Sequence, residues 1–377
     1  MASTEHNIIP SSKRCHEMRI AQICKYANTT VQGVDLFEEV ARAFPDHQFD
    51  FYVLHGDSNH AESRLNCNMV HCHFAKKQLK RVRFSVLIEL LTKLRRAPLD
   101  VVITHRVTPT ILIALIQLFL NIPRKIAVIH GIGQFRKPRR KLFLRLWLRS
   151  WTIVAVSEAV AEDLVRSGFS SKQVKVIRNA VNEELVQNNL LSREEARKAL
   201  GIPSHVGRLA GTIGRLHRVK GHRYLVHALA KEPAALPVAI IGGGSEEAAL
   251  KAQIKQQALQ NRLFLCGPFK NAYRYLSAFD VFIMPSVSEG LPISILEAIS
   301  AGVPAFGTSV GGIPEILPNP EWTLPPQDSQ ALAKRLLTLT TCTESDLRTI
   351  AKAQHQVMED KFGIEQYHQA FRELALG

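Results

Sequence analysis

Two carboxylates in the second half of the chain, Glu289 and Glu297, have a spacing that suits the binding of hydroxyl groups. The apolar run Val281–Pro285 before them is typical of a buried parallel strand. Pro292 suits the first position of the following helix, which we expect to end near Gly302. Glu289 is therefore expected on the loop that leaves the strand, and Glu297 inside the helix.

The backbone at the start of this helix supplies a second part of the predicted site. We expect the amides of Gly290, Leu291 and Ile293 to point out of the helix N-terminus, where they can bind a phosphate. Carboxylates on either side can accept hydrogen bonds from sugar or ribose hydroxyls. This combination is what an enzyme that acts on a nucleotide sugar needs.

A basic loop upstream could bind the leaving group of such a reaction. Arg215 and Lys220 follow the predicted strand Leu209–Ile213. Glycines flank the loop at Gly214 and Gly221 and allow close backbone approach. Breaking a nucleotide–sugar bond leaves a diphosphate, so neutralising its growing charge is the main catalytic task. The alternative interpretation is a solvated basic loop.

Four stretches in chain order resemble the motifs of retaining GT-B glycosyltransferases, above all those of glycosyltransferase family 4. They are Gly214–Gly221, Ile241–Glu246, Asp280–Ser286 and the Glu-x7-Glu pair formed by Glu289 and Glu297. The resemblance is strong over residues 205–318 and thinner before them. It implies an α/β fold of GT-B type, in which two Rossmann-like domains face a central cleft.

The resemblance also implies roles for the residues of the second half. Arg215 and Lys220 would bind the donor diphosphate next to Gly214. Gly242 and Gly244 would shape the nucleotide pocket, although a strand that ends in glycines is often only a turn.

Phe269 falls where the family contacts the base. Glu297 would accept hydrogen bonds from the ribose, and Glu289 would face the transferred sugar. The family has no well-placed protein nucleophile, so the leaving phosphate would help to deprotonate the acceptor hydroxyl.

Two histidines of the first half end predicted strands. His130 follows Lys125–Ile129, and His105 follows Val101–Thr104. Both would lie at the carboxyl edge of a sheet, where open α/β folds bind ligands. The resemblance implies that His130 is catalytic and lies beside the acceptor and the donor sugar, and that His105 lies on the acceptor side; the alternative is that each is a routine turn residue. Gly33, in the first loop, would approach the donor phosphate.

Strand and helix patterns alternate twice along the chain, as expected of two doubly wound parallel sheets. We predict an acceptor-binding domain over residues 1–182, a nucleotide-sugar-binding domain over 183–359, and a helix at about 360–377 that crosses back to the first domain. Ser192 and Glu195 predict a capping box. The other expected strands are Met18–Cys24, Phe49–Leu54, Ile153–Val156, Val238–Ile241, Leu263–Leu265, Val281–Met284 and Val303–Phe306.

The formal net charge of +15 is concentrated in one part of the chain. Residues 51–150 hold 19 Lys and Arg against 4 Asp and Glu, and the remaining residues hold 29 of each sign. Two amphipathic stretches carry these cations, and we expect their apolar stripes to pack into the core. The first has Lys76, Lys77, Lys80, Arg81, Arg83, Lys93, Arg95 and Arg96 around Leu79, Val82, Val86, Leu87, Leu90 and Leu94. The second has Arg136, Arg139, Arg140 and four further bases among Leu142, Phe143, Leu146 and Trp147.

Seven bases and no acid between Arg136 and Arg149 exceed what solubility requires. Such basic amphipathic helices can lie on an anionic membrane surface. We therefore expect contact with a membrane surface or with a phosphorylated acceptor, in which Arg136, Arg139 and Arg140 take part. The alternative is that the cations are merely solvated.

Cysteine usage and targeting signals limit the cellular compartments in which the protein is expected. The six cysteines show no disulfide framework, which indicates a reducing compartment. Cys67, His71, Cys72 and His73 superficially suggest zinc, but strand alternation points Cys72 away from the histidines, and no metal is expected. No signal peptide is recognisable, and the longest apolar run, Ile111–Leu120, is too short to cross a bilayer. We expect a cytoplasmic protein that is peripheral on the inner face of the membrane.

The sequence thus predicts a retaining, metal-independent glycosyltransferase that uses no cofactor and takes a nucleoside-diphosphate sugar, a UDP-sugar being favoured. Its acceptor would be a glycan or glycolipid, as in bacterial lipopolysaccharide core or other cell-surface glycan synthesis. One alternative is a sugar-nucleotide 2-epimerase of the same architecture. The other is a basic nucleic-acid-binding protein, which would leave the second-half motifs without a purpose; we expect no nucleic-acid partner.

Overall fold

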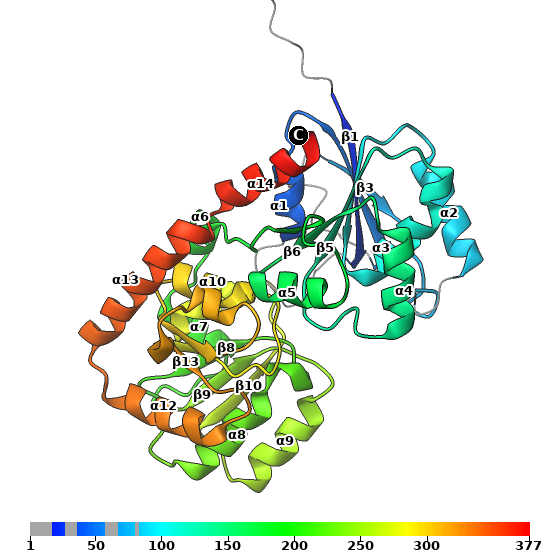
Figure 1. The fold of residues 1–377 in the computed structure, drawn as a ribbon. Coiled ribbons are helices and arrows are strands. Elements are labelled where there is room, and N and C mark those ends of the chain that lie inside the picture. Colours follow the sequence, from blue (N-terminus) through cyan, green and yellow to red (C-terminus); the bar gives the residue numbers. More distant parts are fainter. Residues whose placement is uncertain (1–16, 27–35, 57–66, 80–82) are drawn as a thin grey trace, which may run out of the picture.

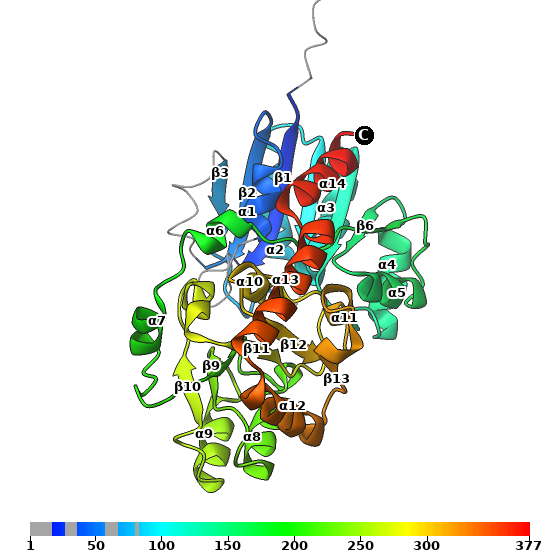
Figure 2. The ribbon, with the colours of Figure 1, turned by 90° about the vertical axis from the view of Figure 1, so that its left-hand side faces the viewer.

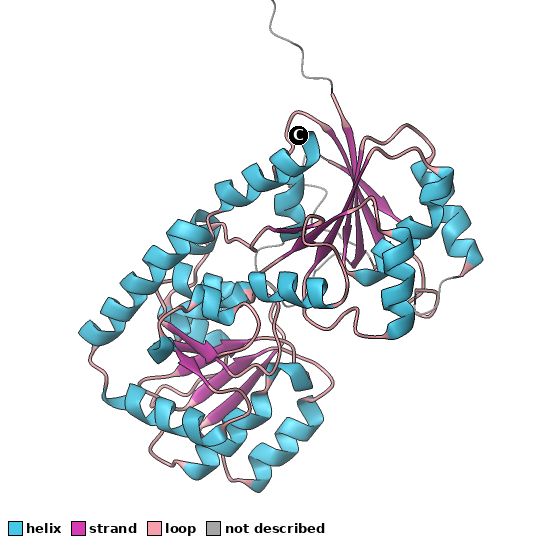
Figure 3. Ribbon diagram, in the orientation of Figure 1, coloured by secondary structure: helices cyan, strands magenta, loops and turns pink. Residues whose placement is uncertain are grey.

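The computed structural model describes residues 17–26, 36–56, 67–79 and 83–377. These residues form two α/β domains, each built on a parallel sheet with helices on both faces (Figure 1, Figure 3). The predicted Gly33 lies outside the described residues, as do Lys80, Arg81 and Val82 of the first basic stretch.

The first sheet has the strand order β3-β2-β1-β4-β5-β6-β7, with parallel neighbours throughout. Its strands are β1 (Arg19–Tyr26), β2 (Gln48–His55), β3 (Asn68–His71), β4 (Val101–His105), β5 (Arg124–Ile129), β6 (Thr152–Ala155) and β7 (Val174–Val176). The helices of this domain are α1 (Leu36–Arg42), α2 (Phe84–Leu94), α3 (Val107–Ile116), the 3-10 turn η1 (Gln117–Phe119), α4 (Pro138–Trp147) and α5 (Glu158–Arg166). Every residue of β4 is buried, because helices cover both faces of a doubly wound sheet.

The second sheet repeats the pattern in the order β10-β9-β8-β11-β12-β13. Its strands are β8 (Ala210–Ile213), β9 (Val238–Ile241), β10 (Leu263–Gly267), β11 (Val281–Met284), β12 (Ala305–Thr308) and β13 (Thr323–Leu324). The helices are α6 (Glu183–Gln187), α7 (Arg193–Ala199), η2 (Arg218–Lys220), α8 (His222–Lys231), α9 (Glu247–Gln256), η3 (Ala272–Ala278), α10 (Ile293–Ser300), α11 (Ile313–Ile316), η4 (Pro320–Trp322) and α12 (Ser329–Thr341). The capping box predicted for Ser192 and Glu195 is present at the start of α7 and is confirmed.

Local sequence explains where the predicted strands needed correction. The strand expected at Val303–Phe306 begins two residues later, at Ala305. Pro304 cannot donate to the strand ladder, and its carbonyl accepts from Phe282 instead. The sequence did not predict β3, β7 and β13; β7 and β13 have three and two residues, and β3 lies at the sheet edge with no fully buried residue.

Two helices connect the end of the chain to the first domain. α13 (Glu344–Lys361) and α14 (Ile364–Leu376) run from the second domain to the first, where α14 lies beside α1 (Figure 1, Figure 2). His368 Nε2 lies 3.0 Å from Glu39 Oε2, and Arg372 donates to the carbonyl of Ala43. The terminal helix therefore ties the two domains together.

The two basic stretches differ in how their apolar residues pack. In α2, Val86, Leu90 and Leu94 are buried as expected. In α4 the expected core packing is wrong for Leu142 and Leu146, whose exposed fractions are 63% and 57%. A helical stripe in the sequence shows which residues share a face but not whether that face is covered.

Candidate active site

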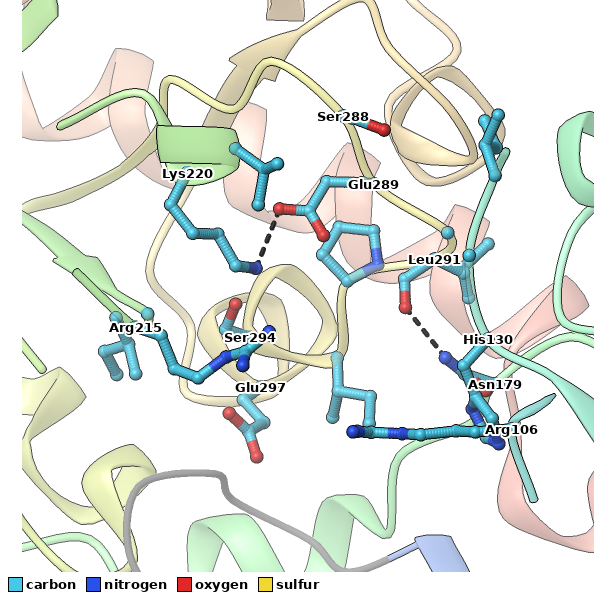
Figure 4. A pocket seen from close by; sticks show the side chains of 18 residues that line it. Arg106, His130, Asn179, Arg215, Lys220, Ser288, Glu289, Leu291, Ser294 and Glu297 are labelled. Carbon is cyan, nitrogen blue, oxygen red and sulfur yellow. Dashed lines mark hydrogen bonds and ion pairs between the residues drawn. The ribbon is translucent and has the colours of Figure 1, made fainter. Parts of the chain in front are cut away.

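A cavity of about 320 Å³ lies between the two domains. Eighteen residues from both domains line it, and Figure 4 shows how their side chains converge. Second-domain members predicted from the sequence are Gly214, Arg215, Lys220, Glu289, Gly290, Leu291, Ile293 and Glu297. From the first domain, His130 lines the same cavity.

Sheet topology explains why these residues meet. In the second sheet the strand order reverses between β8 and β11, which are neighbours although they are distant in sequence. Ligands of open α/β sheets bind at the carboxyl ends of the strands beside such a reversal. Arg215 follows β8 and Glu289 follows β11, so both loops open into the crevice at this point.

Lys220 and Glu289 form an ion pair on the second-domain wall. Lys220 Nζ donates to Glu289 Oε1 at 2.7 Å, and both side chains are largely buried. Ser286 Oγ donates to the same carboxylate oxygen at 2.5 Å. The carbonyl of Ser286 in turn accepts from Thr308 Oγ1. The Glu289 carboxylate is therefore held in one orientation next to a cation.

The glycine-rich loop after β9 supports the Arg215 loop from behind. The Gly214 amide donates to the Ile241 carbonyl, and the Leu216 amide donates to Gly243, both at 3.0 Å. A Cβ on Gly242 would lie 1.9 Å from the Gly214 carbonyl oxygen, so only glycine permits this contact. Gly242 thus positions the basic loop, which is a supporting role that the sequence did not predict.

The start of α10 differs by one residue from the prediction. Pro292 is the N-cap, with an extended backbone, and the helix begins at Ile293. The Leu291 carbonyl before it accepts a hydrogen bond of 2.7 Å from Asn179 Nδ2 of the first domain. The buried Asn179 thereby holds the helix start against the opposite domain.

A close backbone contact with Gly290 holds His130 of the first domain against the loop that precedes α10. A Cβ on Gly290 would lie 2.2 Å from the His130 carbonyl oxygen, which shows how tightly the two loops meet. The imidazole of His130 faces the cavity, and its Nε2 lies 3.0 Å from Nδ1 of His105. His105 is fully buried behind it and does not line the cavity. Both histidines were predicted to contact a ligand, but only His130 has a position that allows such a contact.

The two histidines share a low-polarity environment. Phe37 packs against both rings, at centroid distances of 4.6 and 5.6 Å. Burial, and then the charge of Arg106, lowers the pKa of His130 to about 3. Burial also lowers the pKa of His105 well below its usual value, with further contributions from His130 and Arg106. Both rings are therefore neutral at pH 7, and His130 offers one neutral ring nitrogen to a ligand.

Several predicted residues do not line the cavity. Gly244 packs on the carbonyl of Leu216, and the ring of Phe269 packs against Tyr275 at 4.7 Å. The basic residues predicted for the acceptor side lie on or just before α4, away from the cavity lining; they are Arg136, Arg139 and Arg140. Arg136 is exposed and lies 3.7 Å from Asp163.

Two polar lining residues of the first domain, Arg106 and Asn179, were not predicted as ligand contacts. Arg106 comes directly after His105, which ends a predicted strand. Its place at the end of a strand could therefore be predicted from the sequence. Asn179 lies in the segment between the two domains. Only the hydrogen bond that it donates to the Leu291 carbonyl identifies it as part of the site.

Metal ligands do not gather in the described part of the chain. Within residues 17–26, 36–56, 67–79 and 83–377 no group of three or more His, Cys, Asp or Glu side chains could hold a metal ion. His71 and His73 stack at 5.7 Å, while Cys72 is buried. Across the same described ranges, each helix falls short of the length and apolar character needed to cross a bilayer.

Comparison with known proteins defines the class. A search of solved structures finds HepE of Anabaena, in a structure described as a complex with UDP and glucose, at a TM-score of 0.77 and 18% identity. The match covers 95% of this chain and 99% of that one. The two parallel-sheet domains and their central cleft thus have the GT-B fold that the sequence predicted.

Two family models match the two halves of the chain. The model described as "Glycosyltransferase Family 4" matches residues 35–185, and the one described as "Glycosyl transferases group 1" matches residues 192–356. The chain belongs to the GT-B glycosyltransferases of the family-4 type, which confirms the resemblance stated from the sequence.

Several curated relatives are bacterial glycosyltransferases that are named for the synthesis of a polysaccharide. The amylovoran biosynthesis glycosyltransferase AmsK of Erwinia amylovora is 28% identical over 67% of this chain and 63% of its own length. The putative teichuronic acid biosynthesis glycosyltransferase TuaC of Bacillus subtilis is 31% identical over 54% of this chain and 50% of its own length. The chain therefore spans about half to two thirds of these two relatives. A third relative is 25% identical over 75% of this chain and 76% of its own length; it is named "UDP-Gal:alpha-D-GlcNAc-diphosphoundecaprenol alpha-1,3-galactosyltransferase" from Escherichia coli.

Proposed function

We propose that this protein is a retaining glycosyltransferase that transfers a sugar from a nucleoside-diphosphate sugar to a glycan or glycolipid of the bacterial cell surface. The single observation that carries the proposal is the gathering of Arg215, Lys220 and Glu289 with the start of α10 in one interdomain cavity. This set of groups suits a diphosphate with a sugar attached.

The donor diphosphate would lie between the basic loop and the start of α10. Arg215 and Lys220 neutralise the charge that develops as the bond between the sugar carbon and the phosphate oxygen breaks. The backbone amides at the start of α10 add hydrogen bonds to the same phosphate oxygens. Glu297, which is buried on α10, accepts from the ribose hydroxyls.

The acceptor hydroxyl would attack the same face of the sugar that the phosphate leaves. Its proton passes to the departing phosphate oxygen, and the new bond forms between the acceptor oxygen and the sugar carbon. Glu289 orients the sugar through its hydroxyls, and the neutral His130 binds the sugar or the acceptor from the opposite wall. No protein nucleophile and no metal ion takes part in this proposal.

A UDP-sugar is the favoured donor. The HepE structure, which has the same fold, is described as a complex with UDP and glucose. The galactosyltransferase from Escherichia coli has UDP-Gal in its name. These two neighbours support uracil as the base of the donor nucleotide, but neither of them identifies the sugar.

A lipid-linked acceptor at an anionic membrane surface fits the first domain. The name of the Escherichia coli relative states a diphosphoundecaprenol carrier. Six of the nine large apolar side chains that are exposed in the described residues lie on α2, η1 and α4; they are Phe84, Ile88, Leu118, Phe119, Leu142 and Leu146. We call these six residues, together with the exposed cations that flank α2 (Arg83, Arg95 and Arg96) and those on α4 (Arg139, Arg140 and Arg145), the basic apolar face.

Hydrogen bonds show that the three elements of the basic apolar face are neighbours. The Arg95 side chain, just after α2, donates to the Phe119 carbonyl, and Gln117 donates to the Trp147 carbonyl at the end of α4. Exposed apolar side chains flanked by cations are what a protein needs to lie on anionic lipid. We propose that this face rests on the cytoplasmic leaflet of the membrane.

Incorporation of labelled sugar tests the proposed function. The purified protein is incubated with UDP-, GDP- and ADP-sugars and with vesicles that carry lipid-linked saccharides extracted from bacterial membranes. Label should pass to the lipid fraction with one donor, and Glu297→Gln should abolish the transfer. The anomeric proton coupling of the product, measured by NMR, should match that of the donor.

Two outcomes, the second of which also needs a nucleic-acid binding measurement, would refute the proposal. Conversion of a nucleotide sugar without any acceptor would indicate the epimerase of the same architecture. Absence of transfer from every donor, together with salt-dependent binding of nucleic acid, would indicate the nucleic-acid-binding alternative.

A further inference from the structure

Arg106 has a position in the fold that the donor site does not explain. It follows directly on β4, and β4 pairs with β1 at the point where the strand order of the first sheet reverses. This is the first-domain counterpart of the crevice beside β8 and β11 in the second sheet. By the same topological rule, the loop after β4 is where the first domain is expected to bind its ligand.

The side chain of Arg106 reaches the interdomain cavity. Among the residues that line the cavity, Arg106 is the one Lys or Arg of the first domain, and it faces the cavity from the wall opposite Arg215 and Lys220 (Figure 4). It also lines a smaller cavity with Lys25, Tyr26, Phe37 and His105, whose volume is about 30 Å³. That space holds little more than one water molecule, so a larger ligand meets Arg106 in the main cavity.

The backbone of Arg106 is held in a conformation that normally requires glycine. Its φ is 70° and its ψ is 170°, a region in which side chains other than hydrogen are strained. The Arg106 amide donates to the Val128 carbonyl at 3.0 Å, and the buried Thr110 hydroxyl donates to the Arg106 carbonyl at 2.8 Å. Neighbouring residues thus fix the strained backbone from both sides.

A strained arginine at this place is more readily explained by its side chain than by the fold. Glycine would adopt these dihedral angles without strain, yet the chain has a long cationic side chain aimed into the cavity. The charge of Arg106 is among the causes that lower the pKa values of His105 and His130, so the guanidinium lies close to the first-domain wall of the site. The second domain has its own cations for the donor phosphates, and Arg106 lies on the opposite wall of the cavity, on the side of the first domain.

We propose that Arg106 binds a negatively charged group of the acceptor, a phosphate or a carboxylate, in the interdomain cavity. This inference rests on the proposed function, because it assumes that the second-domain wall holds the donor. A guanidinium can bind either oxyanion through two parallel hydrogen bonds, which fixes both position and orientation. Arg106 would thereby place the acceptor hydroxyl next to the sugar and select acceptors that carry a charge near that hydroxyl.

The decisive variant is Arg106→Gly, because it removes the guanidinium and relieves the backbone strain together. If the arginine serves ligand binding, the melting temperature of the variant should equal or exceed that of the wild type. Arg106→Lys, which keeps the charge and loses the two-pronged geometry, should retain part of the binding. Arg166→Ala is the matched control, because it removes one exposed cation from the far end of α5.

Binding is measured by isothermal titration with simple probes. UDP is titrated first, to report on the donor site. With UDP saturating, the protein is then titrated with methyl glucuronide, glucose 1-phosphate and, as a neutral reference, methyl glucoside. One of the charged sugars should bind the wild type and Arg166→Ala, and its affinity should fall at least tenfold in Arg106→Gly. The affinity for UDP should change less than twofold.

Three results would overturn the proposal. A tenfold loss of UDP affinity in Arg106→Gly, with the charged sugars unaffected, would assign the arginine to the donor diphosphate. Charged sugars that bind the wild type no better than methyl glucoside would remove the proposed ligand class. A melting temperature well below that of the wild type would show a structural role. Failure of the proposed function would be visible separately, as an absence of UDP binding to the wild type.

Discussion

Lys220 and Glu289 contact one another directly, with 2.7 Å between Nζ and Oε1, although 69 positions separate them in sequence. The sequence assigned the lysine to the donor diphosphate and the glutamate to the transferred sugar. Their ion pair means that the two roles are coupled: each side chain orients the other. A donor that binds beside this pair meets a lysine and a glutamate whose orientations are already fixed.

Removal of this lysine should disable transfer without unfolding the protein. In Lys220→Ala the growing charge on the leaving diphosphate loses a cation, and Glu289 keeps the hydrogen bond from Ser286 but loses its ionic partner. We expect kcat/KM for the donor to fall on the order of 100- to 1,000-fold. Steady-state kinetics give this value, and far-ultraviolet circular dichroism checks the fold. Turnover equal to that of the wild type would remove Lys220 from the site.

The contact between Gly290 and His130 predicts a steric test of domain closure. An added Cβ at Gly290 would lie 2.2 Å from the His130 carbonyl oxygen, so Gly290→Ala must separate the two loops. We expect a loss of about 1–3 kcal/mol in the free energy of unfolding. The radius of gyration from small-angle scattering should increase. Gly207→Ala serves as the control, because no atom lies within 4 Å of the added Cβ.

A buried histidine predicts how stability changes with pH. Burial, and then the charge of Lys220, lowers the pKa of His222 to about 3. In the unfolded chain the pKa is about 6.5. Between these values the unfolded chain binds a proton that the folded protein does not, so stability is full above pH 6.5 and decreases as pH falls toward 3.

The corresponding measurement is urea unfolding at pH 7 and pH 5. His222 should contribute a loss of about 2 kcal/mol in the free energy of unfolding between these two pH values. In His222→Gln the loss should be smaller by that amount, while His105 and His130 still contribute in the same direction. An identical pH dependence in variant and wild type would show that His222 is not buried in its neutral form.

The basic apolar face should control binding to vesicles. Charge reversal at Arg139, Arg140 and Lys141 replaces attraction to anionic lipid with repulsion. Each cation near the surface contributes about 1 kcal/mol, so partition should fall on the order of 100-fold at low salt. Sedimentation with vesicles of phosphatidylglycerol and phosphatidylcholine measures the bound fraction.

An apolar variant tests the second half of the same prediction. Leu142→Ser combined with Leu146→Ser should weaken partition even at high salt, because the apolar contribution is not screened. Val165→Ser is the matched control, since Val165 is also exposed but lies on α5 outside the face. Unchanged partition of both sets of variants would contradict the membrane proposal.

Most of the second-domain site followed from sequence because its residues lie at fixed distances from strand ends. Glu289 and Arg215 each follow a strand whose residues are all buried, and the parallel topology brings such strand ends to one edge. The histidine at position 130 was found in the same way.

The remaining features depend on contacts between distant segments. Gly242 supports the Arg215 loop through a backbone approach that the glycine pattern alone does not distinguish from a turn. Arg106 is identified by its strained φ and by the pairing of β4 with β1, which are properties of the folded chain. The exposure of Leu142 and Leu146 was not predictable, because helical periodicity does not show which faces other elements cover.

Titration of a nucleoside diphosphate tests the central claim most directly. UDP, GDP and ADP are each added to the wild type and to Arg215→Ala in a calorimeter, without any acceptor. The account predicts that one diphosphate, expected to be UDP, binds the wild type in a 1:1 ratio and binds Arg215→Ala at least tenfold more weakly. Equal affinity in both proteins, or no heat from any of the three, would contradict the assignment of the interdomain cavity as a nucleotide-sugar site.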